Sequence, residues 1–239
     1  MSRLNWDQAG TKLYETGVDR GVLYVFDTSV GHTGRYQAGV AWNGLTAVTD
    51  SPSGAEANDL YADNIKYLSL MSVEELGLTI EAYTYPEEFE ACDGTAALGT
   101  GVNIGQQPRQ HFGFTYRTRI GDDEVGDSKG YKLHLVYDCL ASPSEKAYST
   151  VNDSPEAITF SWEITTTKID VGSGDYRPIS SITIDSTKID SAKLTAIENI
   201  LYGKDATTGT NATAATDPDL PLPAKIIEIL EDSTIVAQG

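Results

Sequence analysis

Hydrophobic and polar residues alternate strictly along three consecutive segments in the second half of the chain. These segments are FGFTYRTRI (112–120), YKLHLVYDC (131–139) and ITFSWEIT (158–165). Alternation with a period of two over eight or nine residues is typical of a strand that buries one face. The sequence therefore predicts three successive strands that belong to one sheet.

Shorter apolar stretches predict further strands. They lie at 22–26, 40–48, 65–70, 78–85, 179–185 and 226–230. Asn43-Gly44 is a strong hairpin signal, so 40–48 is interpreted as a strand pair or a bulged strand. In 78–85, Leu78, Ile80 and Ala82 are expected to share one face.

One helix is predicted, over about 192–202. Asp190 or Ser191 caps it, an apolar stripe follows, and Gly203 ends it. Residues 5–16 are expected to form only a short helical turn. The chain is thus divided into a β domain with a flanking helix (1–203) and a flexible linker with a C-terminal arm or strand (204–239). Long loops are expected at 49–64 and 86–110, and loops of such length are usually functional.

The loop 121–130 permits the segments 112–120 and 131–139 to pair as a hairpin in which the numbers of the two facing residues always sum to 251. The apolar pairs would then be Phe112–Cys139, Phe114–Tyr137, Tyr116–Leu135 and Thr118–Leu133. The polar face would pair Arg119 with Lys132 and Arg117 with His134, which is unfavourable without nearby carboxylates. Glu81 and Glu163 are candidates within the chain, and an acidic surface of a second subunit is the alternative.

The 239 residues carry a formal net charge of −18. This charge argues against binding nucleic acid or an anionic membrane, because both need Lys and Arg. Neither a signal peptide nor a membrane span is seen, so synthesis in a cytoplasm is expected. The two cysteines, Cys92 and Cys139, are interpreted as buried or idle thiols.

No segment of the sequence carries a specific motif for catalysis or for binding a cofactor or metal. The glycines of 99–105 have GxGxxxG spacing, which does not fit a dinucleotide site. The acidic groups are Glu74-Glu75, Glu87-Glu88 with Glu90, and Asp122, Asp123, Glu124 and Asp127. The histidines, His32, His111 and His134, lack metal-ligand spacing. No catalytic, cofactor-binding or metal-binding residue is therefore assigned, no cofactor is expected, and the chain is interpreted as a non-enzyme.

Four aromatic residues, Trp42, Tyr83, Tyr85 and Trp162, permit a different interpretation. Exposed together, they would form a platform for a sugar ring. Buried, they would be ordinary core or cross-strand aromatics, which is the commoner situation in β proteins.

Several collinear segments resemble the major tail tube proteins of long-tailed, siphovirus-type phages of Gram-positive bacteria. The segments are TGVDRGVLY (16–24), WNGLTAVTDSPSGAE (42–56), IEAYTYPEEF (80–89), IGQQPRQHFGFTYRT (104–118), residues 131–167, IDSTKIDSAKLTAIENILYG (184–203) and DPDLPLP (217–223). The resemblance is specific because it is long and in order.

The resemblance implies a mainly β fold of two packed antiparallel sheets, a sandwich or barrel of tail-tube type, with one flanking helix. It implies a virion protein, made in the host bacterial cytoplasm, whose homo-hexameric rings stack into a tube. The tube would enclose the tape measure protein and meet the tail terminator and distal tail proteins at its ends. DNA would pass through it without specific binding during ejection, and no membrane is involved.

The contacts between copies are expected in the loops 86–110 and 49–64 and in the two terminal arms. The alternative function is a monomeric carbohydrate- or receptor-binding β-sandwich module, which would display an exposed aromatic strip.

Overall fold

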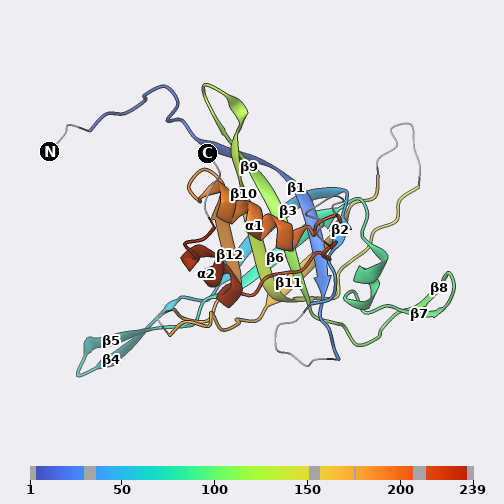
Figure 1. Ribbon diagram of the computed structural model, residues 1–239. Helices are drawn as coiled ribbons and strands as arrows, with labels where there is room; N and C mark the ends of the chain where they lie inside the picture. The colour runs from blue at the N-terminus through green and yellow to red at the C-terminus, as the bar shows by residue number, and fades with distance from the viewer. Residues whose placement is uncertain (1–3, 30–35, 151–156, 175, 207–213, 236–239) are drawn as a thin grey trace.

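The computed structural model describes residues 4–29, 36–150, 157–174, 176–206 and 214–235. Figure 1 shows a mainly β body with two helices on one side and several hairpins that leave it. The strands are β1 (Tyr14–Val25), β2 (Val40–Trp42), β3 (Leu45–Ser53), β4 (Ala57–Ala62), β5 (Ile65–Met71), β6 (Glu75–Ala82), β7 (Ala96–Gly99), β8 (Val102–Ile104), β9 (Phe112–Asp122), β10 (Gly126–Ala141), β11 (Phe160–Thr166) and β12 (Ser181–Asp185). The helices are η1 (Glu87–Ala91, a 3₁₀ helix), α1 (Ser191–Leu201) and α2 (Pro223–Glu231).

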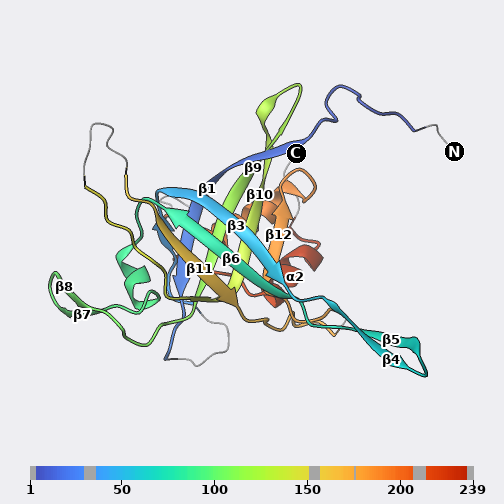
Figure 2. The same cartoon turned by 180° about the vertical axis from the view of Figure 1, so that it is seen from behind.

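The main sheet is antiparallel, in the order β2-β1-β9-β10-β11-β6-β3. Strand β10 pairs with two different strands along the same edge. Its residues Lys132–Val136 pair with β12, and its residues Cys139–Ala141 pair with β11. Strands β11, β6 and β3 form a layer that crosses β1 and β9, and in the reverse view of Figure 2 this layer lies in front. The predicted mainly β fold of packed antiparallel layers is confirmed.

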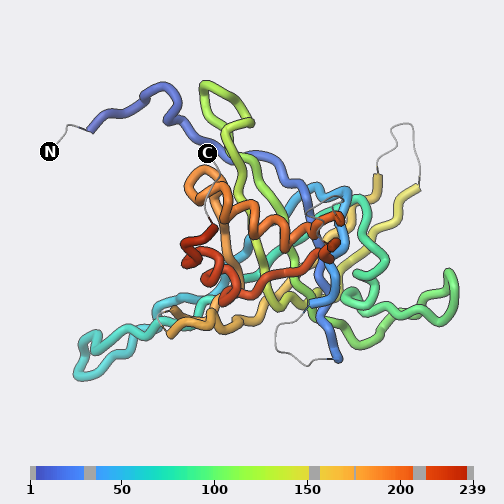
Figure 3. The backbone as a smooth tube through the Cα atoms, viewed as in Figure 1, coloured from blue at the N-terminus to red at the C-terminus, as the bar shows by residue number. Residues whose placement is uncertain are grey.

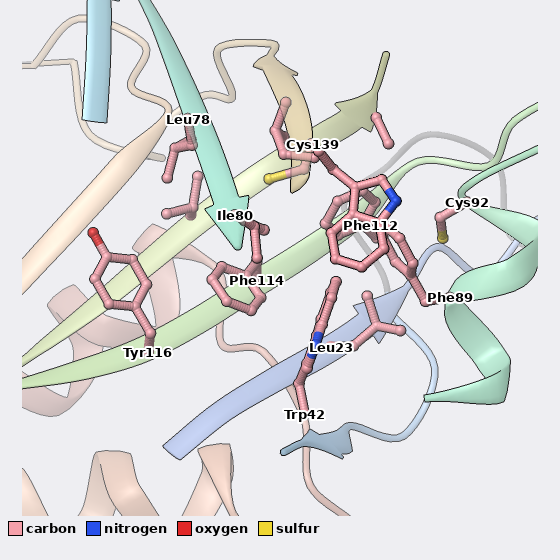
Figure 4. Close-up of a cluster of buried hydrophobic side chains, with 14 of the residues drawn as sticks. Leu23, Trp42, Leu78, Ile80, Phe89, Cys92, Phe112, Phe114, Tyr116 and Cys139 are labelled. Carbon is pink, nitrogen blue, oxygen red and sulfur yellow. The ribbon is translucent and has the colours of Figure 1, made fainter. Parts of the chain in front are cut away.

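The first core lies between these two layers. Figure 4 shows Trp42, Phe89, Phe112 and Phe114 converging there with Ile80. The rings meet mostly edge to face or tilted, with centroids 4.6 Å apart for Trp42 and Phe89 and 5.6 Å for Trp42 and Phe114. Each fully buried side chain of this size contributes about 1.5–3 kcal/mol, so this cluster is a main source of stability.

The second core lies on the outer face of β1, β9, β10 and β12, beneath the helices. Helix α1 begins at the predicted place, because the Asp190 carboxylate accepts from the backbone N–H groups of Ala192 and Lys193. Helix α2 replaces the strand that was predicted at 226–230. Pro223 starts it, and Ile226 and Ile229 share the buried stripe. A five-residue apolar run fits either structure, and Pro at the first position decides for the helix.

The C-terminal segment crosses the same face before α2 begins, and Figure 3 shows it running beside α1. Leu220 is buried, and the Tyr137 hydroxyl donates to the carbonyl of Pro221 at 2.9 Å. Residues 218–231 thus share a core with the β domain. The division of the chain at residue 203 stays a prediction.

The predicted register of β9 and β10 is correct only at Phe112–Cys139. Between Gly130 and Val136 of β10 the numbers of the facing residues sum to 250, so Phe114 faces Val136 and Tyr116 faces His134. The cause is a bulge before Cys139, where Asp138 has a φ of +46°. A one-residue slip moves Leu133, Leu135 and Tyr137 to the opposite face from Phe114. Both faces of the β9–β10 pair are therefore covered, one by each core. The sequence pattern had predicted strands that bury only one face.

Other sequence predictions need correction. Residues 5–16 contain no helical turn, and β1 begins at Tyr14. Strands β2 and β3 flank Asn43-Gly44 but do not pair with each other, since β2 pairs with β1 and β3 with β6. The expected loops 49–64 and 86–110 hold parts of β3, strand β4, helix η1 and the β7–β8 hairpin.

Candidate assembly surface

Strands β4 and β5 form a hairpin that leaves the body entirely (Figures 1 and 2). Its two-residue turn is Asp63-Asn64, with φ values of +52° and +63°. Positive φ at both central residues is the type I′ geometry that matches strand twist. The hairpin is held by its own ladder and by Lys66, whose ammonium lies 2.7 Å from the Asp59 carboxylate.

Large apolar side chains cover this hairpin and its base without burial. They are Leu60, Tyr61, Ile65, Tyr67, Leu68, Leu70, Met71 and Val73. Ile65, Tyr67 and Met71 are each about two-thirds exposed (65%, 69% and 70%). The register shifts at Tyr67, so Ile65 and Met71 lie on opposite faces of the hairpin. Leu60 and its partner Leu68 lie on the face of Ile65. An isolated two-stranded hairpin is marginally stable, and contiguous exposed apolar surface marks an interaction site.

A second hairpin, β7–β8, exposes Leu98, Val102 and Ile104. Its base is fixed to the body by Asp93, a nearly buried carboxylate. Lys146 Nζ lies 2.5 Å from Asp93 Oδ2, and Arg109 Nη1 lies 3.3 Å from Oδ1. The hairpin therefore has an anchored base and an uncovered apolar end.

The glycine-rich stretch 99–105 includes the turn of this second hairpin. Gly101 has a φ of +74°, and an added Cβ there would meet no atom within 4 Å. These glycines shape a hairpin turn, and the stretch opens no helix.

Arg117 and Arg119 find their partner on β1. The Arg117 guanidinium donates twice to the Asp19 carboxylate, at 2.7 and 2.8 Å, and Arg119 shares the same acceptor. These bonds from Arg117, and then from Arg119, lower the pKa of Asp19. Lys132 pairs with Glu15. The basic cluster is thus neutralised within the chain, but by β1 and not by Glu81 or Glu163.

The acidic tip of β9–β10 has a local structural role. The buried Asp122 carboxylate accepts from Lys129 Nζ at 2.6 Å and from the backbone N–H groups of Glu124 and Val125. The bond from Lys129, followed by those from the backbone, lowers the pKa of Asp122 to about 2. Asp123 accepts from the backbone of Gly10 and Lys12, which fixes the start of β1 to the tip.

The remaining candidates lie apart. The His134 ring stacks on Tyr116, and His111 Nδ1 lies 2.5 Å from Asp138 Oδ1. His32 lies outside the described residues. Glu90 accepts from the Asn103 amide. Within the described part of the chain, no group of three or more His, Cys, Asp or Glu side chains is placed to hold a metal ion.

Three of the four platform aromatics belong to the first core or pack against it. Trp42 and Trp162 are buried with ring centroids 5.6 Å apart, and Tyr85 packs edge-on against Trp162. Tyr83 alone is exposed. The core interpretation of these residues is therefore confirmed.

Both cysteines are buried free thiols, as expected. Burial raises the pKa of Cys92 to about 12 and that of Cys139 well above its ordinary value. A search of the described helices finds none that is both long and apolar enough to cross a membrane.

Sequence reasoning missed the β4–β5 hairpin as a unit. Its first strand and turn fell inside an expected loop, although ANDLYA and IKYLSLM flank the Asp63-Asn64 turn. Two consecutive residues that tolerate positive φ between such segments were the available signal.

The solved structures that are similar to this chain include the following two. One is a chain of the anti-feeding prophage baseplate, determined by cryo-electron microscopy, with a TM-score of 0.34 and 8% sequence identity, covering 71% of this chain and 95% of the other. The second belongs to the sheath–tube complex of an extracellular contractile injection system in its extended state, with a TM-score of 0.30 and 12% identity, covering 70% and 88%. No protein-family model and no curated protein sequence matches the chain.

Proposed function

We propose that this chain is a structural virion protein whose copies form stacked hexameric rings, the tail tube through which phage DNA is ejected. The observation that carries the proposal is the projecting β4–β5 hairpin, with large apolar side chains on both faces. Contiguous exposed apolar surface on an unpaired hairpin is typical of a site that another chain covers. The collinear resemblance to tail tube proteins supports the same function.

The energetics favour a partner that covers most of the hairpin. Burying apolar surface yields about 25 cal/mol per Å², and a Leu, Ile or Met side chain yields about 1.5–3 kcal/mol when fully covered. Covering Leu60, Ile65, Leu68 and Leu70, which share one face of the hairpin, would therefore contribute several kcal/mol per contact. Association costs a comparable amount in lost rigid-body freedom, so repeated contacts in a ring or tube are needed for tight assembly.

The charge fits a conduit for DNA. Six copies would carry six times the formal charge of −18. An acidic wall repels the phosphate backbone and leaves DNA free to move. In the proposed virion the tape measure protein fills the tube before ejection, and the tail terminator and distal tail proteins close its ends.

The alternative of a monomeric carbohydrate- or receptor-binding module requires an exposed aromatic strip. The two tryptophans that would build it, Trp42 and Trp162, are fully inside the first core. We therefore prefer assembly.

A hairpin variant tests the proposal. We expect Ile65→Thr/Tyr67→Thr/Met71→Thr to fold normally, because these side chains are exposed and Thr is compatible with a strand. The variant should lose assembly, measured by light scattering and negative-stain electron microscopy. Tyr148→Thr/Tyr176→Thr is the matched control, since both residues are exposed but lie off the hairpin. Normal assembly of the hairpin variant would refute the role of this surface.

A further inference from the structure

We infer that residues 4–13 of one copy dock in a groove beside β1 of a second copy, with Trp6 as the anchor. This inference rests on the proposed self-assembly and names one of its contacts. It adds a donor segment and an acceptor groove to the hairpin surface described above.

The donor segment contains a turn at Gln8–Thr11 and carries uncovered apolar residues. Leu4, Trp6 and Leu13 are exposed, and Trp6 is 75% exposed. It is the only exposed one of the three tryptophans, since Trp42 and Trp162 are buried. The segment is fixed only at its base, where the backbone N–H groups of Gly10 and Lys12 donate to Asp123 at 3.1 and 3.3 Å. A large aromatic held in water beside a fixed base is a typical interface anchor.

The acceptor groove has a volume of about 570 Å³ and lies where β1, β2 and β3 meet. Val18, Val22 and Leu45 supply apolar walls, and Arg20 and Tyr202 supply the polar rim. The groove exists because β1 bulges between Asp19 and Val22, and because β2 pairs with β1 only over Gly21–Leu23. An indole side chain is small enough to enter a space of this size.

The edge of β1 beside the groove is open. Residues Tyr14–Arg20 face β9 along one edge, and on the other edge the described residues form no ladder with them. An extended segment can add to such an edge through main-chain hydrogen bonds, while its side chains enter neighbouring pockets.

The charges of the two surfaces are complementary at one point. Asp7 follows the anchor directly, and the exposed Arg20 lies on the groove rim with its guanidinium 5.8 Å from the Tyr202 ring centroid. A surface ion pair of this kind contributes only about 0–1 kcal/mol, so it affects the orientation of the docked segment more than its affinity. Burial of Trp6 would provide most of the binding free energy.

The donor and the acceptor lie at opposite sides of the molecule. In Figures 1 and 2 the N-terminal segment leaves the body on the side away from β2. A segment that points away from its own groove contacts a second copy head to tail. Such a heterologous contact repeats from copy to copy and closes into a ring or continues as a helix, whereas a self-complementary patch would stop at a dimer.

Cross-linking between two single-cysteine variants tests the contact. Asp7→Cys and Asn43→Cys place thiols on the donor and on the groove, and both native cysteines are buried. With a short bis-maleimide, we expect covalent dimers in the assembled mixture of the two variants and none from either variant alone. An assembled mixture without cross-linked dimers would overturn the inference. So would a double variant that links only within one chain.

Fluorescence separates this inference from the proposed function. Assembly of the unmodified chain should reduce acrylamide quenching of Trp6 several-fold, whereas Trp6→Phe should show no such change. Trp6→Ala should raise the concentration needed for assembly about tenfold or more. If the unmodified chain does not assemble, the proposed function fails; if it assembles while Trp6 remains fully quenchable, only the docking of Trp6 is refuted.

Discussion

At the scale of single residues, His134 shows how the fold sets the chemistry of a side chain. Its ring stacks on Tyr116, with centroids 4.5 Å apart and 8° between planes. Its Nε2 atom lies 2.9 Å from Thr118 Oγ1, and its Nδ1 atom lies 3.4 Å from Thr183 Oγ1. Burial among these groups lowers the pKa of His134. The folded state therefore favours the neutral ring.

This burial makes stability depend on pH near neutrality. A histidine whose pKa is lower in the folded state stabilises the fold above its unfolded pKa of about 6.5, and that contribution is lost as pH falls through the folded value. Asp50, Glu15 and Lys132 act on the same ring, with smaller effects than burial.

We expect the free energy of unfolding to fall more steeply between pH 7.5 and pH 5 in the unmodified chain than in His134→Gln. Glutamine keeps a hydrogen-bonding side chain but does not titrate. Urea unfolding at four pH values measures the difference. Equal slopes in the two proteins would contradict the assignment of this pH dependence to His134.

The ion-pair partners of individual residues were the feature that the sequence predicted least well. The sequence indicated a basic cluster on β9 and β10 and the need for carboxylates, and both inferences are confirmed. It did not identify Asp19 and Glu15, because their strand was expected to start at residue 22. Since β1 begins at Tyr14, it brings these carboxylates beside Arg117 and Lys132.

At the scale of elements, the alternating strands and the capped helix α1 followed from the sequence. Period-two patterns and an Asp N-cap are local signals, so they survive any tertiary arrangement. The β9–β10 register and helix α2 did not follow. The register depends on a bulge at Asp138. Helix α2 depends on Pro223 at its first position, because the apolar run at 226–230 fits either structure by itself.

Packing of the C-terminal segment in the second core can be tested by substitution of Leu220. Leu220 is buried against the sheet, and a Cβ built on Gly113 would lie 2.2 Å from Leu220 Cδ2. The glycine on β9 therefore makes room for this leucine. Leu220→Ala should cost about 2–4 kcal/mol, as large-to-small core changes do.

A double-mutant cycle makes the contact specific. Gly113→Ala alone should also destabilise the protein, since the added methyl group clashes with Leu220 and with Tyr36. In Gly113→Ala/Leu220→Ala the clash with Leu220 is removed, so we expect the double variant to be more stable than the sum of the single changes implies. Additive losses in urea unfolding would mean that this segment does not pack on β9 in solution.

At the scale of the whole molecule, the chain combines a well-filled body with uncovered projections. The two cores enclose aromatic residues of the main sheet such as Tyr24, Phe114 and Trp162. The β4–β5 hairpin, the β7–β8 hairpin and residues 4–13 leave apolar side chains in water. The sequence predicted the body from pattern, but it could not show which apolar residues lack cover. Exposure depends on where a hairpin points, and only the tertiary arrangement determines that.

The projections point in different directions from one body (Figures 1 and 2). Contacts made through separate surfaces on separate sides can act together, one set closing a ring and another set stacking rings. A binding module for a single ligand needs only one such surface. The distribution of uncovered apolar groups thus supports the proposal of a repeating assembly.

Cryo-electron microscopy of the purified chain at high protein concentration tests this central claim most directly. Our account expects hollow tubes of stacked six-membered rings, with the β4–β5 hairpin buried against a neighbouring copy. A population made only of separate 25.7 kDa monomers, with that hairpin still in solvent, would contradict it.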